Sequence, residues 1–457
     1  MNAQNDFSQG SIRKAIIRMA IPMTFAQVIN LLYNIVDRMF IGRIPNEGTL
    51  ALTGLGLCFP IIMMVTAFTN LFGVGGAPLS SIERGKGNDE EAQNIMGTSF
   101  SLLIIAGIIL TVVGILFKKP ILYLFGASDS TYPYANQYLS IYLLGTIFVM
   151  ISLGMNSFIN NQGFAKIGML TTALGCVTNI ILDPILIYIC KLGVQGAAIA
   201  TIVSQLLSAI WVLRFLTGKE TILRLEKRSL TLRWDRVKKI TALGLAGCVV
   251  QFTNSAVTIV CNRCLSIYGG DLYVGVMTIL NSIREIFNLP VHGITNGAGP
   301  VLSFNYGAKE YKRVQESIRF MSTVTIIYTF AAWLVLILIP KPFINLFNSD
   351  PELTEASIHA INIYFFGFFM MALQFAGQIT FTSLGKSKQA IFFSIFRKII
   401  IVVPLTIYIP MLLHNGVDGV FMAEPISNFI GGGACFITMQ LTIGKELKTK
   451  MKEKENH

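Results

Sequence analysis

Charge is scarce in this sequence. Only 13% of the 457 residues are Asp, Glu, Lys or Arg, compared with about 25% in soluble globular domains. Hydrophobic residues make up 53%, and the mean hydropathy is +0.62. A soluble chain of this length needs charge over its surface, and a disordered chain is poor in hydrophobic residues, so both classes are excluded. The composition instead predicts a membrane protein with several spans.

Motifs for metal or disulfide chemistry are also lacking. The seven cysteines lie in or beside apolar stretches, which indicates packing residues rather than a secreted disulfide framework. A membrane prenyl- or acyltransferase would need a metal-binding carboxylate motif or a His/Asp pair, and neither is visible in the sequence. We therefore expect no catalytic residues and no cofactor, and we predict that the protein is not an enzyme. The four histidines have no metal-ligand spacing (His292, His359, His414 and His457).

Long apolar runs predict an all-α integral membrane protein with twelve transmembrane helices. The runs are continuous over about 20 residues, whereas barrel strands alternate over about 10. The predicted spans are 15–40, 50–72, 94–117, 135–160, 167–190, 196–216, 240–264, 273–300, 318–339, 358–383, 390–412 and 417–443.

The net charge of +12 follows from this topology. Most of the 36 Lys and Arg residues lie in the termini and in the connections from even to odd spans, including the basic segment 214–239. Basic loops stay in the cytoplasm, so we expect both termini to be cytoplasmic. The positive charge therefore predicts no nucleic-acid partner, and the partners we expect are the lipid bilayer and small molecules.

The two halves of the chain repeat each other. Pro78, Pro120 and Tyr142 recur in the same order and at the same offset as Pro300, Pro342 and Tyr364. Six spans per repeat give both copies the same orientation, which predicts two six-helix lobes from a parallel internal repeat, as in rocking transporters. The expected domains are an N-terminal lobe over 1–216, a basic cytoplasmic linker over 217–239 and a C-terminal lobe over 240–457. Duplication also occurs in channels and membrane enzymes, but we favour a transporter.

Polar residues form stripes on several predicted spans. Gln27, Asn30, Asn34 and Asp37 fall on one face of the first span, and a similar stripe follows the seventh span. Hydrogen bonding between helices would explain single Ser or Thr residues. Stripes that combine amides with carboxylates favour a hydrated cavity or a translocation path.

Four acidic residues lie inside predicted spans: Asp37, Asp183, Glu285 and Glu424. A charged residue at the centre of a membrane helix raises the free energy of insertion by about 2.5–3.5 kcal/mol, so each of these acids requires a partner or a function. Asn179 shares a face with Asp183, and depth along the helices places Thr201 and Asp37 in the same outer band of the N-terminal lobe. Such a cluster could hold a proton shared between carboxylates or a hard cation such as Na⁺. The alternative is a static hydrogen-bonded pair.

The second half of the chain differs in charge. Arg284 precedes Glu285, but adjacent helical residues point about 100° apart, so the two do not simply neutralise each other. Arg397 or Lys398 could partner either Glu285 or Glu424. The Asn179/Asp183 pair has no counterpart in this half, so we expect the ion cluster in the N-terminal lobe alone.

Three motifs carry a family resemblance over nearly the whole chain. They are GVGGAPLSSIERGKGNDEEA (73–92), GPVLSFNYGAKEYKRV (299–314) and TNIILDPILIY (178–188). Together they resemble the MATE family of multidrug and toxic compound extrusion transporters, with most similarity to its bacterial MepA-like members. The resemblance implies a multi-pass protein of the bacterial plasma membrane, which exports amphipathic, often cationic drugs in exchange for H⁺ or Na⁺. It is expected to act as a monomer.

The resemblance also implies roles for single residues. In DinF-like members the N-lobe cation site matches Asp37, Asn179, Asp183 and Thr201 here, and a nearby tyrosine matches Tyr33. NorM-like members use acids on the seventh and tenth spans, where this chain has none. A lipid or lipid-linked saccharide flippase of the same superfamily is the alternative function. The expected substrate-cavity residues are Gln27, Asn30, Tyr33, Asn34, Asn156, Gln251, Asn254 and Glu285.

Overall fold

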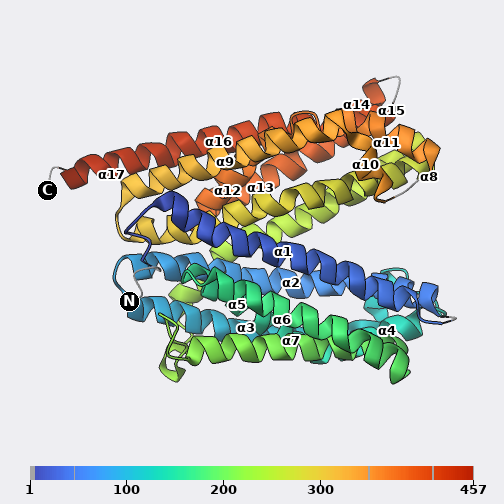
Figure 1. The fold of residues 1–457 in the computed structure, drawn as a ribbon, viewed down its shortest axis with the longest axis horizontal. Coiled ribbons are helices and arrows are strands. Elements are labelled where there is room, and N and C mark those ends of the chain that lie inside the picture. The colour runs from blue at the N-terminus through green and yellow to red at the C-terminus, as the bar shows by residue number, and fades with distance from the viewer. Residues whose placement is uncertain (1–5, 46, 348–349, 414–415, 456–457) are drawn as a thin grey trace. The chain divides into compact units, whose positions relative to one another are not determined.

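A computed structural model describes residues 6–45, 47–347, 350–413 and 416–455, and this part of the chain is helical with no strand (Figure 1). The first half contains α1 (Ile12–Gly42), α2 (Gly48–Gly85), α3 (Asp89–Leu124), α4 (Tyr132–Leu144), α5 (Thr146–Asn161), α6 (Ala165–Pro184), the π-helix η2 (Ile185–Ile189), α7 (Gly193–Thr217) and the 3₁₀-helix η3 (Lys227–Ser229).

The long helix α8 (Trp234–Gly307) opens the second half. It is followed by α9 (Tyr311–Leu338), α10 (Pro340–Asn345), α11 (Pro351–Tyr364), η4 (Phe368–Met370), α12 (Met371–Ser383), α13 (Ser387–Ile395), η5 (Phe396–Val402), α14 (Val403–Leu412), α15 (Gly416–Ser427), η6 (Asn428–Gly432), α16 (Gly433–Met439), η7 (Gln440–Gly444) and α17 (Lys445–Glu455). Among these, η5, η6 and η7 are π-helices that continue the α-helices beside them.

The twelve predicted spans are present in the described residues. Nine helices are long and apolar enough to cross a membrane, and two bent pairs bring the number to eleven. In addition, α8 contains two helices that meet at Gly270. The sequence predicts a break between these two spans, and the structure has it at Gly270, whose φ of 69° and ψ of −164° are not helical, so the chain bends there between the two helices.

The bent pairs occupy equivalent places in the two repeats. Helices α4 and α5 meet at 57° beside Gly145, and α11 meets the segment from Phe368 to Ser383 at 49° beside Gly367. Gly367 has a φ of 69°, which suits glycine. The same turn of the fold is therefore built twice, in agreement with the repeat in the sequence.

The chain forms two compact units. Among the described residues, unit 1 holds Asp6 and Pro22–Gly244, while unit 2 holds Phe7–Ile21 and the chain from Leu245 onward. The division inside α1 falls at Pro22, which has no backbone N–H to donate within the helix. The first helix of each half thus begins in one unit and continues in the other.

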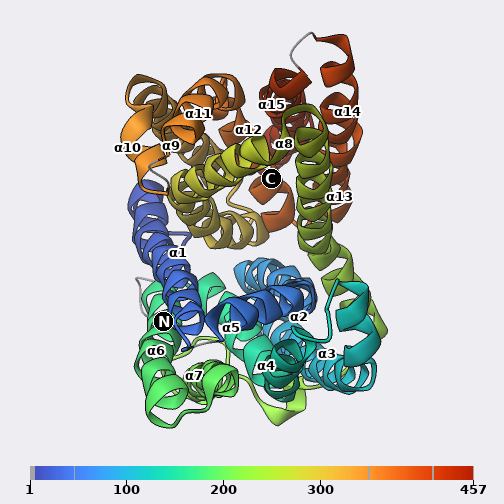
Figure 2. The same ribbon diagram turned by 90° about the vertical axis from the view of Figure 1, so that its right-hand side faces the viewer.

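Helices α2 and α5 of unit 1 lie side by side (Figure 2), and they approach each other closely where both carry small residues. A methyl group on Gly73 of α2 would lie 2.6 Å from the Cα of Gly154 on α5. Such contacts between small residues are the usual means of packing helices in a membrane, where apolar surface alone gives no preference for another helix.

The basic segment between the halves is ordered against unit 1. The side-chain oxygen Oε1 of Gln162 accepts hydrogen bonds from the Thr221 hydroxyl and from the backbone N–H groups of Ile222 and Leu223. Arg236 donates through two nitrogens to the carboxylate of Glu91, at 2.8 and 2.7 Å. The segment expected as a linker is therefore docked on the helices of unit 1.

Unit 2 has a core of apolar side chains from α8, α9, α11 and α15. Phe365 and Phe421 are fully buried in it, and Tyr364 lies beside both rings. This core holds α8 and α15 against each other at the level of a buried charged cluster.

Candidate functional site

The four expected cation-site residues come from three neighbouring helices of unit 1. Asp37 lies on α1, Asn179 and Asp183 lie on the last turns of α6, and Thr201 lies on α7. Pro184 ends α6, and the π-helix η2 follows at once. Proline removes a backbone donor and π-helical turns are frequent at functional sites, so the local backbone here departs from a plain membrane span.

Two contacts hold α1 against α6 and η2 around this point. The hydroxyl of Tyr188 donates to the carbonyl oxygen of Phe40 at 2.6 Å. Two turns away, the thiol of Cys176 lies 3.7 Å from the carbonyl oxygen of Ile29. Asp37 lies between these contacts along α1, so its carboxyl group is kept next to α6.

The four side chains meet in one buried cluster. The Asn179 amide donates to Oδ1 of Asp183 at 3.3 Å and lies 3.5 Å from the Thr201 hydroxyl. The carboxyl groups of Asp37 and Asp183 lie next to each other. Asn179 and Asp183 are completely buried, and Asp37 and Thr201 are 8% and 5% exposed.

Three oxygens in this cluster are buried without a hydrogen-bond donor among the described residues. They are Oδ1 of Asp37, Oδ1 of Asn179 and Oδ2 of Asp183. A buried carboxylate that lacks a partner costs several kcal/mol, and two of them side by side cost more. A shared proton or a bound cation would remove this cost, because either one gives the oxygens a positive partner.

Tyrosines surround the cluster. Tyr33 and Tyr138 lie close to both Thr201 and Asp37, and Tyr142 lies beside them. Tyr138 of α4 was not among the expected residues. Its single signal in the sequence is its position four residues before the repeated Tyr142, which places both on one face of α4.

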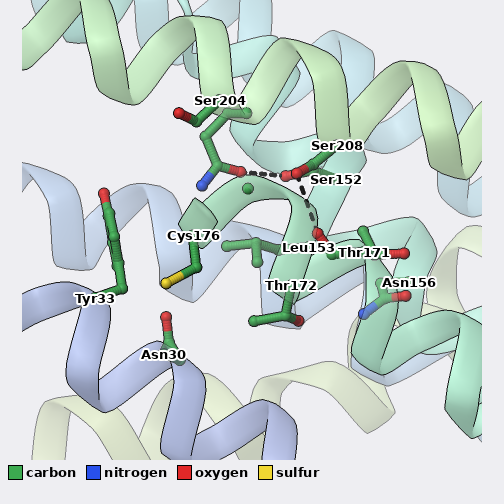
Figure 3. A pocket seen from close by; sticks show the side chains of 12 residues that line it. Asn30, Tyr33, Ser152, Leu153, Asn156, Thr171, Thr172, Cys176, Ser204 and Ser208 are labelled. Carbon is green, nitrogen blue, oxygen red and sulfur yellow. Dashed lines mark hydrogen bonds between the residues drawn. The ribbon is translucent and has the colours of Figure 1, made fainter. Parts of the chain in front are cut away.

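A polar pocket lies beside the cluster within unit 1 (Figure 3). Asn30 and Tyr33 reach from α1 toward Cys176 of α6, and Thr172 and Asn156 lie farther along the wall. The pocket encloses about 450 Å³, including the volume open to solvent. Hydroxyl and amide groups from α5, α6 and α7 line its far side (Ser152, Thr171, Ser204, Gln205 and Ser208).

The expected cavity residues separate into two groups. Asn30, Tyr33 and Asn156 line the pocket of unit 1, and Asn254 lines a second pocket in unit 2. The remaining residues line neither pocket, and Asn34 donates to the carbonyl oxygen of Asn30 on its own helix. That group consists of Gln27, Asn34, Gln251 and Glu285, of which Asn34 and Glu285 are exposed.

In the structure, the basic residues inside the spans of the second half pair with Glu424. Arg284, Arg397 and Lys398 all lie within 3.3–3.6 Å of Oε1 of Glu424. Glu285 makes no ion pair within the described ranges. Between residues 6 and 455, apart from the gaps, no three His, Cys, Asp or Glu side chains gather as a metal site would require.

Comparison with known families decides the identity of this fold. The profile described as MatE matches the chain twice, over residues 22–185 and 247–408. The chain belongs to the MatE family. The two matches correspond to the two repeats, and MatE proteins are transporters, so this chain is a multi-pass membrane transporter and not an enzyme. The predicted family and fold class are confirmed.

Relatives and solved structures agree with this MatE assignment. The multidrug export protein MepA of Staphylococcus haemolyticus is 25% identical over 439 residues, which cover 95% of each chain. The probable multidrug resistance protein NorM of Thermotoga maritima is 25% identical over 364 residues, or 79% of this chain and 77% of the relative. A crystal structure of MATE in the bent conformation has a TM-score of 0.93 at 23% identity, and the match covers 99% of this chain and all of that one.

Proposed function

We propose that this MatE protein is an antiporter that exports amphipathic, often cationic, drugs in exchange for H⁺ or Na⁺. Relatives named multidrug export protein support the class of substrate. The coupling ion is assigned to the cluster of Asp37, Asn179, Asp183 and Thr201.

One observation carries this proposal: three buried oxygens of the cluster receive no donor from the part of the chain that the structure describes. A cluster whose only task was packing would satisfy its polar atoms within the protein. A coupling ion must bind and dissociate, so its ligands are oxygens whose positive partner is the ion itself and not another group of the protein. Asp37, Asn179 and Asp183 provide such oxygens. Either gradient can drive export, since a tenfold proton gradient or a charge crossing 100 mV supplies about 1.4 or 2.3 kcal/mol.

The adjoining pocket supports coupling between ion and substrate. It shares Tyr33 with the cluster, because Tyr33 lies close to Thr201 and also lines the pocket. A substrate in the pocket and an ion in the cluster would therefore act on the same side chain. Through Tyr33, the binding of either ligand can lower the affinity of the protein for the other.

The two repeats support transport by rocking of the two units. In transporters with parallel repeats, the two halves move largely as rigid bodies around the substrate. Both repeats are in one chain, so a monomer is the expected transporting unit. We assign the termini to the cytoplasm because the basic connections lie on their side of the predicted topology.

Transport into everted membrane vesicles tests the proposal. Ethidium uptake is measured under an imposed proton gradient, a Na⁺ gradient, or neither. Wild type is expected to accumulate ethidium with one of the gradients, and Asp37→Asn and Asp183→Asn are expected to lose this uptake. The matched control is Asp129→Asn, which changes an exposed carboxylate of unit 1 and is expected to transport like wild type. Full gradient-driven uptake by both cluster variants would refute the assigned site.

A further inference from the structure

A second charged cluster lies within unit 2 and is not used by the proposed coupling. Its carboxylate is Glu424 of α15, whose Oε1 lies 3.6 Å from Arg284 of α8 and 3.3 and 3.4 Å from Arg397 and Lys398 of η5. The side chains of Glu424 and Arg397 are each 7% exposed. Lys398 is 12% and Arg284 is 21% exposed, so Arg284 is the most accessible of the three cations.

Arg397 and Lys398 are adjacent residues that both reach one oxygen of Glu424. Both lie in the π-helical turn η5, and π-helical turns are frequent at functional sites.

Positive charge exceeds negative charge in this cluster. Three cations share one carboxylate, and the neighbouring Glu285 is exposed and forms no ion pair in the described part of the chain. Arg397 also donates to the amide oxygen of Asn428, and Arg284 donates to the Tyr364 hydroxyl at 2.6 Å. These neutral acceptors satisfy hydrogen bonds but do not cancel charge. A buried excess of cations is costly unless an anion can approach it.

A pocket opens onto these cations, within unit 2. Arg284, Lys398 and Glu424 are part of its wall, and the pocket encloses about 400 Å³, including the volume open to solvent. Asn254 and Asn281 add amide groups, and Thr258, Tyr364 and Thr406 add hydroxyls. Apolar side chains and the Cys261 thiol supply the rest of the lining (Val257, Cys261, Met277, Val402, Val420 and Ala423). The pocket therefore combines basic groups with apolar surface, which is the chemistry that an amphipathic anion requires.

The repeat relates this pocket to the acidic cluster of unit 1. Tyr364 corresponds to Tyr142, and Glu424 occupies the position of Thr201. In the described residues, the equivalent place in the fold thus has two carboxylates without an ion pair in unit 1, and one carboxylate shared by three cations in unit 2.

We propose that the pocket of unit 2 binds the carboxylate of an amphipathic substrate through Arg284 and Lys398. The inference rests on the proposed export function and deepens it, because it assigns the carboxylate of a zwitterionic or anionic substrate to this pocket. Arginine suits this role because its planar guanidinium group can donate two parallel hydrogen bonds to one carboxylate.

Binding of a zwitterionic fluoroquinolone and of its methyl ester to purified protein in detergent tests the proposal. The ester keeps the amine and the ring system but has no carboxylate. Wild type is expected to bind the acid at least about tenfold more tightly than the ester, as charge-assisted hydrogen bonds imply. Lys398→Met and Arg284→Gln are expected to lose this preference. Arg263→Gln, which removes an exposed cation from the part of α8 before Gly270, is expected to retain it.

Three results would overturn the inference. One is equal affinity of wild type for acid and ester, another is a preference that survives in both cluster variants, and the third concerns lipid. Lys398→Met leaves two cations for Glu424, so it keeps the proposal testable if Arg284→Gln does not fold. Competition by phosphatidylglycerol but not by phosphatidylcholine in nanodiscs would overturn the assignment to a soluble carboxylate in favour of a lipid headgroup.

The experiments distinguish a failure of the proposed export function from a failure of the proposed carboxylate site. Ethidium has no anionic group, so its gradient-driven uptake by wild type tests export without the carboxylate pocket. The ratio of acid to ester affinity is measured without a gradient and tests the pocket alone.

Discussion

Replacement of Glu424 by glutamine isolates the energetic importance of the charged cluster in unit 2. The substitution keeps the size of the side chain but removes the one carboxylate that three cations share. At separations of 3.3–3.6 Å, each ion pair has a gross attraction of about 5 kcal/mol at an effective dielectric constant of about 20. The desolvation of Glu424 offsets much of this attraction, so the net loss expected is about 3–5 kcal/mol, the range for breaking a buried pair.

Thermal unfolding in detergent measures this loss. Glu424→Gln is expected to lower the Tm by on the order of 10 °C for a unit of this size. Glu285→Gln is the matched control, since Glu285 is exposed and has no ion pair in the described residues, and it is expected to leave the Tm within about 2 °C. Adding Lys398→Met to Glu424→Gln removes one uncompensated cation and is expected to recover part of the loss. A Tm for Glu424→Gln equal to that of Glu285→Gln would refute the reasoning.

Three further predictions concern packing, the linker and topology. Gly73→Ala is expected to lower stability by about 1–3 kcal/mol, because its methyl group would meet the backbone of α5, whereas Gly56→Ala, with open space around it, is expected not to destabilise. Gln162→Leu removes the acceptor of the docked segment 218–233 and is expected to speed tryptic cleavage there, as followed by gel electrophoresis of limited digests; an unchanged cleavage rate would contradict the docking. Cys190 is exposed and is expected to react with a membrane-impermeant maleimide in intact cells. If Cys190 reacted in everted vesicles but not in intact cells, the assigned topology would be reversed.

Much of the fold follows from the sequence because membrane helices leave a strong signal. A span of about 20 apolar residues has few structural alternatives in lipid, so the number of helices and the repeat could be predicted. The juxtaposition of Asp37, Asn179, Asp183 and Thr201 also followed from depth along the helices, since a carboxylate inside a span requires partners at its own level.

Other features depend on backbone geometry that the sequence does not reveal. Arg397 and Lys398 share one partner from within a π-helical turn, and α-helical spacing suggests neither the turn nor the shared partner. The connection between the two helices of α8 is a kink at Gly270, whereas hydropathy suggests a loop of several residues. The division of α1 between units at Pro22 reflects tertiary packing, which hydrophobic runs alone do not determine.

Ion displacement by substrate tests the central claim most directly. Purified protein in weakly buffered detergent is mixed with ethidium, and released protons are measured with a pH-sensitive dye, with and without Na⁺, while bound ²²Na⁺ is followed in parallel. The account predicts that wild type releases a proton or Na⁺ when ethidium binds, and that neither Asp37→Asn nor Asp183→Asn does so. Equal ion release from wild type and both variants would contradict the assignment of the coupling ion to these carboxylates.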